Sequence, residues 1–67
     1  MTDILMNAIY QSEAQLALYE REMDKSGDID FKIAVFHLYD DEQRRYNKLM
    51  EALGDAVIYG NQNSVIH

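Results

Sequence analysis

Hydrophobic residues recur at steps of three, four or seven over residues 3–25, a stretch that no Gly or Pro interrupts. They are Leu5, Ala8, Ile9, Leu16, Tyr19 and Met23. This spacing brings side chains to one face of a helix. Thr2 or Asp3 can cap its start, and Ser26-Gly27 can end it, with Gly27 in the left-handed conformation common after a helix. The pattern therefore predicts an amphipathic helix over residues 3–25.

A second stripe with helical spacing predicts another helix over residues 31–53, capped by Asp28 or Asp30. Its members are Ile33, Phe36, Tyr39, Tyr46, Met50 and Leu53. Asp40 and Gln43, three residues apart, have the form of a capping box and leave open a break near Asp40. Because no Gly or Pro lies between residues 28 and 53, we favour one continuous helix.

The pattern changes at Gly54, where we expect the second helix to end. Residues 56–59 form a short apolar run, 60–63 read Gly-Asn-Gln-Asn, and the chain closes with Ser-Val-Ile-His. A small hairpin, a helical extension with a loose tail, and a segment ordered by a partner all remain open here. We predict an all-α fold: a helical hairpin domain over residues 1–55 and a short irregular or β-prone tail over residues 56–67.

Each predicted helix carries a second apolar line, well away from the first. In the first helix it contains Met6, Tyr10, Ala14 and Ala17. In the second helix it contains Phe31, Ala34, Leu38, Leu49, Ala52 and Ala56. A helix that is apolar on two sides needs two neighbours, but a two-helix hairpin provides only one. In addition, a single core below about 70 residues supplies only a few kcal/mol.

These second lines predict that two hairpins pair into a four-helix bundle. We expect the homodimer interface to contain Met6, Tyr10, Ala14, Ala17, Phe31 and Leu38. The alternative is a compact three-helix monomer whose tail covers the second line.

Composition narrows the class of protein. The chain has 67 residues, no Cys, Pro or Trp, and twelve acidic against six basic residues, a net charge of −6. Without cysteine, a disulfide scaffold and a thiolate metal site are excluded. No apolar run exceeds four residues, and the first residues carry no basic region. We therefore expect no membrane span and no secretory signal, and a cytoplasmic location.

Two small clusters resemble ion or catalytic sites only in part. Oxygen-bearing side chains alternate from Asp24 to Asp30 as in a calcium loop, but the positions that need Gly and a bidentate Glu hold other residues. His37 lies three residues before Asp40, which is typical of a pair on a helix surface. No nucleophile motif and no Gly-rich phosphate loop is present. We predict no metal, no cofactor and no enzymatic activity.

Acidic residues are concentrated in residues 1–42, which carry ten acidic and three basic groups. Residues 43–67 carry two acidic and three basic groups. A body with this charge repels nucleic acids, so we expect no direct nucleic-acid binding. The same charge attracts basic clefts on proteins. The predicted partner-binding surface consists of Glu20, Glu22, Asp24, Asp28, Asp30, Asp40, Asp41 and Glu42.

The sequence thus predicts a small acidic, non-enzymatic protein that binds another protein and modulates or inhibits it. A basic nucleic-acid-binding protein is one such partner, and the chain would then be a nucleic-acid-mimicking decoy of the kind found in phages and mobile elements. The alternative is a structural or assembly adaptor that binds a partner helix through an apolar helix face, its acidity serving solubility alone.

Overall fold

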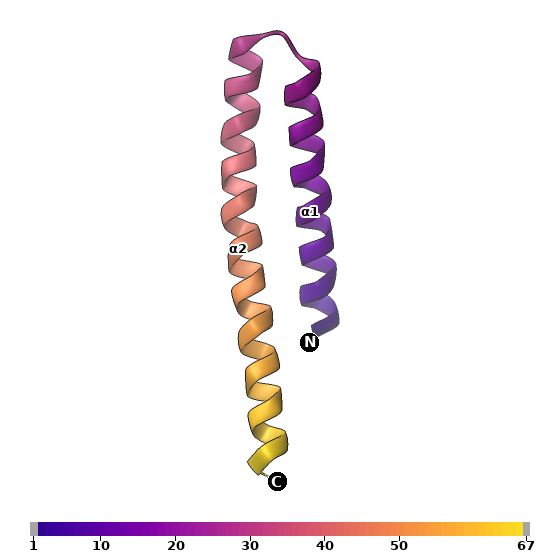
Figure 1. Ribbon diagram of the computed structural model, residues 1–67, viewed down its shortest axis with the longest axis vertical. Coiled ribbons are helices and arrows are strands. Elements are labelled where there is room, and N and C mark those ends of the chain that lie inside the picture. The colour runs from indigo at the N-terminus through magenta and orange to yellow at the C-terminus, as the bar shows by residue number, and fades with distance from the viewer. Residues whose placement is uncertain (1, 67) are drawn as a thin grey trace.

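The computed structural model describes the backbone of residues 2–66 and the side chains of residues 2–58. It consists of two antiparallel helices, α1 (Thr2–Lys25) and α2 (Ile29–Ile66), joined by a short turn (Figure 1). The molecule is a rod of 58 × 15 × 13 Å. This confirms the predicted all-α helical hairpin. α2 passes through Asp40 without interruption, as favoured from the sequence.

The side chains turned toward the opposite helix follow a heptad spacing, with alternating steps of three and four residues. In α1 the buried or half-buried side chains with this spacing are Leu5, Ile9, Ser12, Leu16, Tyr19 and Met23. In α2 they are Lys32, Val35, Tyr39, Glu42, Tyr46, Leu49, Leu53 and Ala56. This spacing is that of two helices packed as in a coiled coil, and we call these residues the seam.

The apolar stripe predicted for α1 is confirmed, but half of the stripe predicted for α2 is wrong. Ile33, Phe36 and Met50 are 52%, 56% and 44% exposed, whereas Val35 and Leu49 lie in the seam. The seam also contains polar residues, among them Ser12 and Glu42, to which a pattern of hydrophobic positions gives no weight. A stripe chosen by hydrophobicity alone therefore sets α2 at the wrong rotation about its axis.

The turn between the helices is held by side-chain caps. Asp28 Oδ1 accepts hydrogen bonds from the backbone N–H of Asp30 (3.0 Å) and of Phe31 (3.4 Å). Ser26 Oγ accepts one from the Asp28 N–H at 3.1 Å. Asp28 is thus the predicted cap of α2. The left-handed conformation expected of Gly27 is wrong, because its φ is not positive; the hydroxyl and carboxylate caps make the turn without it.

The predicted end of the second helix at Gly54, and the irregular or β-prone tail, are wrong for residues 56–66, which continue α2. His67 lies outside the described residues. A glycine inside a helix costs roughly 1 kcal/mol relative to alanine but does not stop it. α2 is 14 residues longer than α1 (38 against 24), and its C-terminal part projects past the start of α1 (Figure 1). Within the described range, neither helix combines the length and hydrophobicity that a membrane span requires.

Candidate functional site

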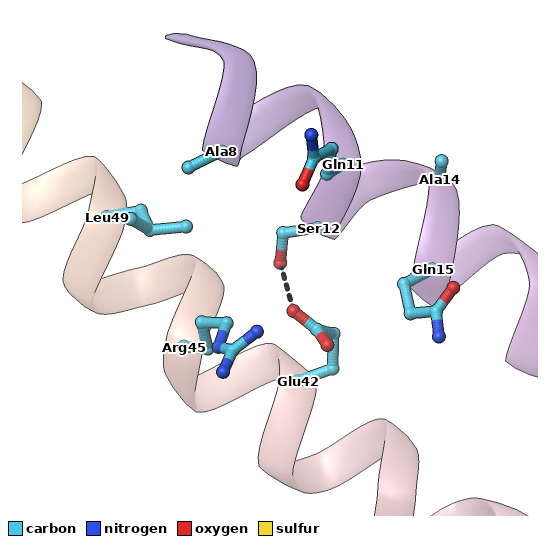
Figure 2. Close-up of a pocket in the computed structure, with 8 residues that line it drawn as sticks. All are labelled: Ala8, Gln11, Ser12, Ala14, Gln15, Glu42, Arg45 and Leu49. Atoms are coloured by element: carbon cyan, nitrogen blue, oxygen red, sulfur yellow. Dashed lines mark hydrogen bonds between the residues drawn. The ribbon is translucent and has the colours of Figure 1, made fainter. Parts of the chain in front are cut away.

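A polar pair lies in the middle of the seam. Ser12 Oγ donates a hydrogen bond of 2.6 Å to Glu42 Oε2 (Figure 2). The serine is only 3% exposed and the glutamate is half-buried. A hydrogen bond to a charged acceptor is stronger than one between neutral groups, so this pair joins the two helices across 30 positions of sequence.

Two tyrosines bridge the helices along one side of the seam. Tyr39 Oη donates to Glu20 Oε1 at 3.1 Å, and Tyr46 Oη donates to Glu13 Oε1 at 3.4 Å. The two bonds are seven residues apart on each helix, one heptad of antiparallel register. The hydrogen bond to Glu20 raises the pKa of Tyr39 above its ordinary value, and burial and the negative charge of Glu20 add to the effect.

The hairpin therefore has two different flanks. We call the side that carries the tyrosine–glutamate bonds the tyrosine flank. We call the opposite side the groove flank, since an open groove runs along it beside the Ser12–Glu42 pair (Figure 2). The side chains that line this groove are Ala8, Gln11, Ser12, Ala14, Gln15, Glu42, Arg45 and Leu49.

Four of the eight predicted acidic residues already have a partner within the chain. Glu20 and Glu42 accept the interhelical hydrogen bonds described above, and Asp28 caps α2. Asp40 Oδ2 lies 3.1 Å from Arg44 Nη2, one helical turn away. These carboxylates stabilise the hairpin, so their presence is explained without any partner protein.

The other four are Glu22, Asp24, Asp30 and Asp41. Within the described part of the chain, their side chains form neither a hydrogen bond nor an ion pair. Glu22, Asp24 and Asp30 lie near the turn end of the rod, with Glu22 on the groove flank and Asp24 on the tyrosine flank. Asp41 is eleven residues beyond Asp30, roughly 16 Å along the helix axis. The eight predicted acids therefore do not form one surface: four lie near the turn, three lie along the middle of α2, and Glu20 lies on α1 opposite Tyr39.

The six residues predicted for the homodimer interface also lie in different places. Tyr10 and Ala17 are exposed on the tyrosine flank and Met6 is half-buried there, whereas Ala14 points away from α2 (Figure 2). Phe31 and Leu38, 42% and 51% exposed, lie on the groove flank. One flat interface cannot contain all six.

Sequence reasoning missed a continuous exposed line on the tyrosine flank of α2. Its members are spaced by seven residues: Ile29, Phe36, Gln43, Met50 and Val57. They are exposed apart from Gln43, which is half-buried. The heptad repeat of α2 could have revealed this line. A pattern with a period of 3.5 residues assigns these residues and the seam residues to different faces of the helix.

The described residues include no group of three or more His, Asp or Glu side chains that could hold a metal ion. The oxygens of Ser26 and Asp28, in the turn that resembles a calcium loop, are instead engaged by backbone N–H groups. No protein family, no characterised protein and no solved structure matches the chain. Its function is therefore argued from its surfaces.

Proposed function

We propose that this chain is a small acidic, non-enzymatic protein that binds another protein and modulates it through the turn end of the hairpin. The observation that supports this most directly is the group of three carboxylates, Glu22, Asp24 and Asp30, that have no hydrogen-bonding or ionic role among the described side chains. Asp24 and Asp30 are exposed and Glu22 is half-buried.

The turn end has the electrostatic character that a basic partner requires. Residues 20–30 carry five carboxylates against two cations, Arg21 and Lys25, a local net charge of −3. Exposed charges of one sign raise the rate at which an oppositely charged surface associates, and salt screens this effect within about 10 Å. A nucleic-acid-binding protein is one partner of this chemistry, since carboxylates at the turn would occupy positions that phosphates take in its cleft.

An aromatic side chain beside these carboxylates supplies apolar contact area. Phe31, 42% exposed, lines a shallow depression together with Glu22, Lys25, Ser26 and Asp28. Aromatic residues at the centre of an interface contribute much of its binding energy, while charged residues around them govern the association rate. The partner would accordingly present an apolar pocket with a basic rim, and binding would block access to that pocket.

The test is a pair of triple variants with equal changes in net charge. Proteins captured from the native cell at low and moderate salt are first identified. Association is then measured for Glu22→Gln/Asp24→Asn/Asp30→Asn, and separately for the control variant Asp3→Asn/Glu51→Gln/Asp55→Asn. We expect the first variant to slow association about tenfold at low salt and the control to change it little. Equal effects from both variants would overturn the turn end as the recognition surface.

An assembly adaptor is the second candidate, because Phe31 and Leu38 are exposed one heptad apart on the groove flank. An adaptor of this kind would bind a partner helix through these two side chains. Leu38→Ala would then abolish binding, whereas the charge variant at the turn would leave the affinity unchanged. If Leu38→Ala still binds and the charge variant at the turn associates more slowly, the result supports recognition through the acidic turn.

A further inference from the structure

We infer that a second copy of this chain docks on the tyrosine flank of α2, with the two copies antiparallel and related by a two-fold axis near Gln43. This face differs from the interface predicted from the sequence, which combined residues of both flanks. The inference does not depend on the proposed function, since it rests on apolar residues of α2 and not on Phe31 or on the carboxylates used there.

The hairpin exposes more surface than a compact monomer of the same mass. Its accessible surface is 5342 Å² for a mass of 7.8 kDa. A compact monomer of that mass exposes about 4,400 Å². The excess, roughly 900 Å², is close to the 800 Å² or so that each partner buries in a stable interface of standard size. An interface with a second rod would bury an area of this order.

Large apolar side chains lie exposed along the tyrosine flank of α2. On the tyrosine flank, Ile29, Phe36, Met50 and Val57 are 66%, 56%, 44% and 47% exposed. Near the turn this line widens into a depression lined by Met23, Ile29, Lys32, Ile33, Phe36 and His37. Exposed large hydrophobic side chains on one flank, here two on each side of the polar Gln43, are typical of an interaction surface.

The order of residues along this line favours a second copy of the chain as the molecule that docks on the tyrosine flank. Gln43 is at the centre, with Ile29 and Phe36 before it and Met50 and Val57 after it at the same intervals of seven. Two antiparallel copies would bring Phe36 opposite Met50 and Ile29 opposite Val57, with the two glutamines near the axis. A two-fold interface requires such self-complementarity.

Charge favours the antiparallel over the parallel arrangement. By the heptad spacing, the charged side chain that α2 carries on this flank between Ile29 and Val57 is Asp40, since Glu42 lies in the seam and Arg45 lines the groove. Parallel pairing in register would place the two Asp40 carboxylates side by side, and like charges in contact oppose association. Antiparallel pairing about Gln43 separates them.

The first test compares substitutions at two positions of α2 that are two residues apart. Phe36 and Leu38 are similarly exposed (56% and 51%) but lie on opposite flanks. We expect the wild type to sediment with about twice its chain mass of 7.8 kDa. We expect Phe36→Glu to raise the dimer dissociation constant about 100-fold or more, and Leu38→Glu to change it less than about threefold. Far-UV circular dichroism verifies that both variants remain helical.

The second test uses disulfide formation and does not depend on disrupting the interface. Because the chain contains no cysteine, a single one can be introduced without side reactions. A mixture of Phe36→Cys and Met50→Cys should cross-link on oxidation, whereas each variant alone should not. A matched mixture of Leu38→Cys and Ala52→Cys, on the groove flank, should remain uncross-linked.

Four results would overturn the inference. A monomeric mass at every concentration would exclude the dimer. Cross-linking of Phe36→Cys with itself would show a parallel pair. Dissociation by Leu38→Glu with Phe36→Glu still dimeric would move the interface to the groove flank, and a protein that binds the tyrosine flank of a monomeric chain would identify a different occupant.

Discussion

Ser12 donates a hydrogen bond of 2.6 Å to Glu42 at the centre of an otherwise largely apolar seam. A slip of one heptad between the helices would bring Leu5 or Tyr19, in place of Ser12, opposite the carboxylate of Glu42. The slipped pairing with Leu5 would leave a half-buried charge without a donor, which costs more than the bond itself contributes. A polar residue in a coiled-coil seam is a well-attested means of specifying register. The Ser12–Glu42 pair therefore disfavours the slip that brings Leu5 opposite Glu42.

Ser12→Ala should lower the free energy of unfolding by about 1–3 kcal/mol, since it leaves the Glu42 carboxylate without its donor. The double variant Ser12→Ala/Glu42→Leu should recover most of that loss, because an apolar pair needs no hydrogen bond. Urea denaturation measures both variants. Gln11→Ala, exposed on the same groove, is the control and should change stability little. A Ser12→Ala variant as stable as the wild type would contradict the assigned role.

Gly54→Ala should raise the free energy of unfolding by about 0.5–1 kcal/mol, because Gly54 lies inside a continuous helix and alanine is the better helix former. A Cβ added at this position has nothing within 4 Å, so no clash offsets the gain. Thermal unfolding followed by circular dichroism measures the change. If α2 instead ended at Gly54 in a left-handed conformation, the same substitution would destabilise the protein.

Asp28→Ala should destabilise the hairpin by about 0.5–2 kcal/mol, because Asp28 Oδ1 accepts hydrogen bonds from two backbone N–H groups at the start of α2. Asp28→Asn should retain most of the stability, since asparagine caps helices about as well. Asp24→Ala removes a charge of the same sign nearby but no cap, and serves as the control. Loss of stability in Asp28→Asn equal to that in Asp28→Ala would show that charge matters here and capping does not.

Stability should fall at alkaline pH in a manner that depends on Tyr39. Its pKa is raised in the folded state by the hydrogen bond to Glu20, by burial and by the glutamate charge, so the folded state holds the phenolic proton more tightly than the unfolded state. The resulting stabilisation is present below about pH 10, the ordinary tyrosine pKa, and is lost as the pH rises through the higher folded value.

The measurement is urea denaturation as a function of pH for the wild type and Tyr39→Phe. The variant should lose less stability than the wild type above about pH 10, since it has no proton to release at this position. Tyr10→Phe, at an exposed position on α1, is the control and should follow the wild type. Identical pH profiles for all three proteins would show that Tyr39 does not couple folding to pH.

The sequence predicted α1 more accurately than α2 for an identifiable reason. In α1 the apolar stripe with Leu5, Ile9 and Leu16 coincides with the seam, so hydrophobicity alone placed the helix correctly. In α2 two apolar sets compete, and the stronger by hydrophobicity, with Ile33 and Phe36, is the exposed one. The candidate surfaces inherited this error, because residues on opposite flanks were combined into one interface.

Local preferences in the amino-acid sequence were enough to predict two helices, the turn between them and a cap at Asp28 or Asp30, since each depends on residues close together in the chain. The tertiary structure alone decided the rotation of α2 and which carboxylates bond within the hairpin. These features depend on contacts between residues up to 33 positions apart, such as Glu13 and Tyr46. Only the packing of one helix against the other brings such residues together.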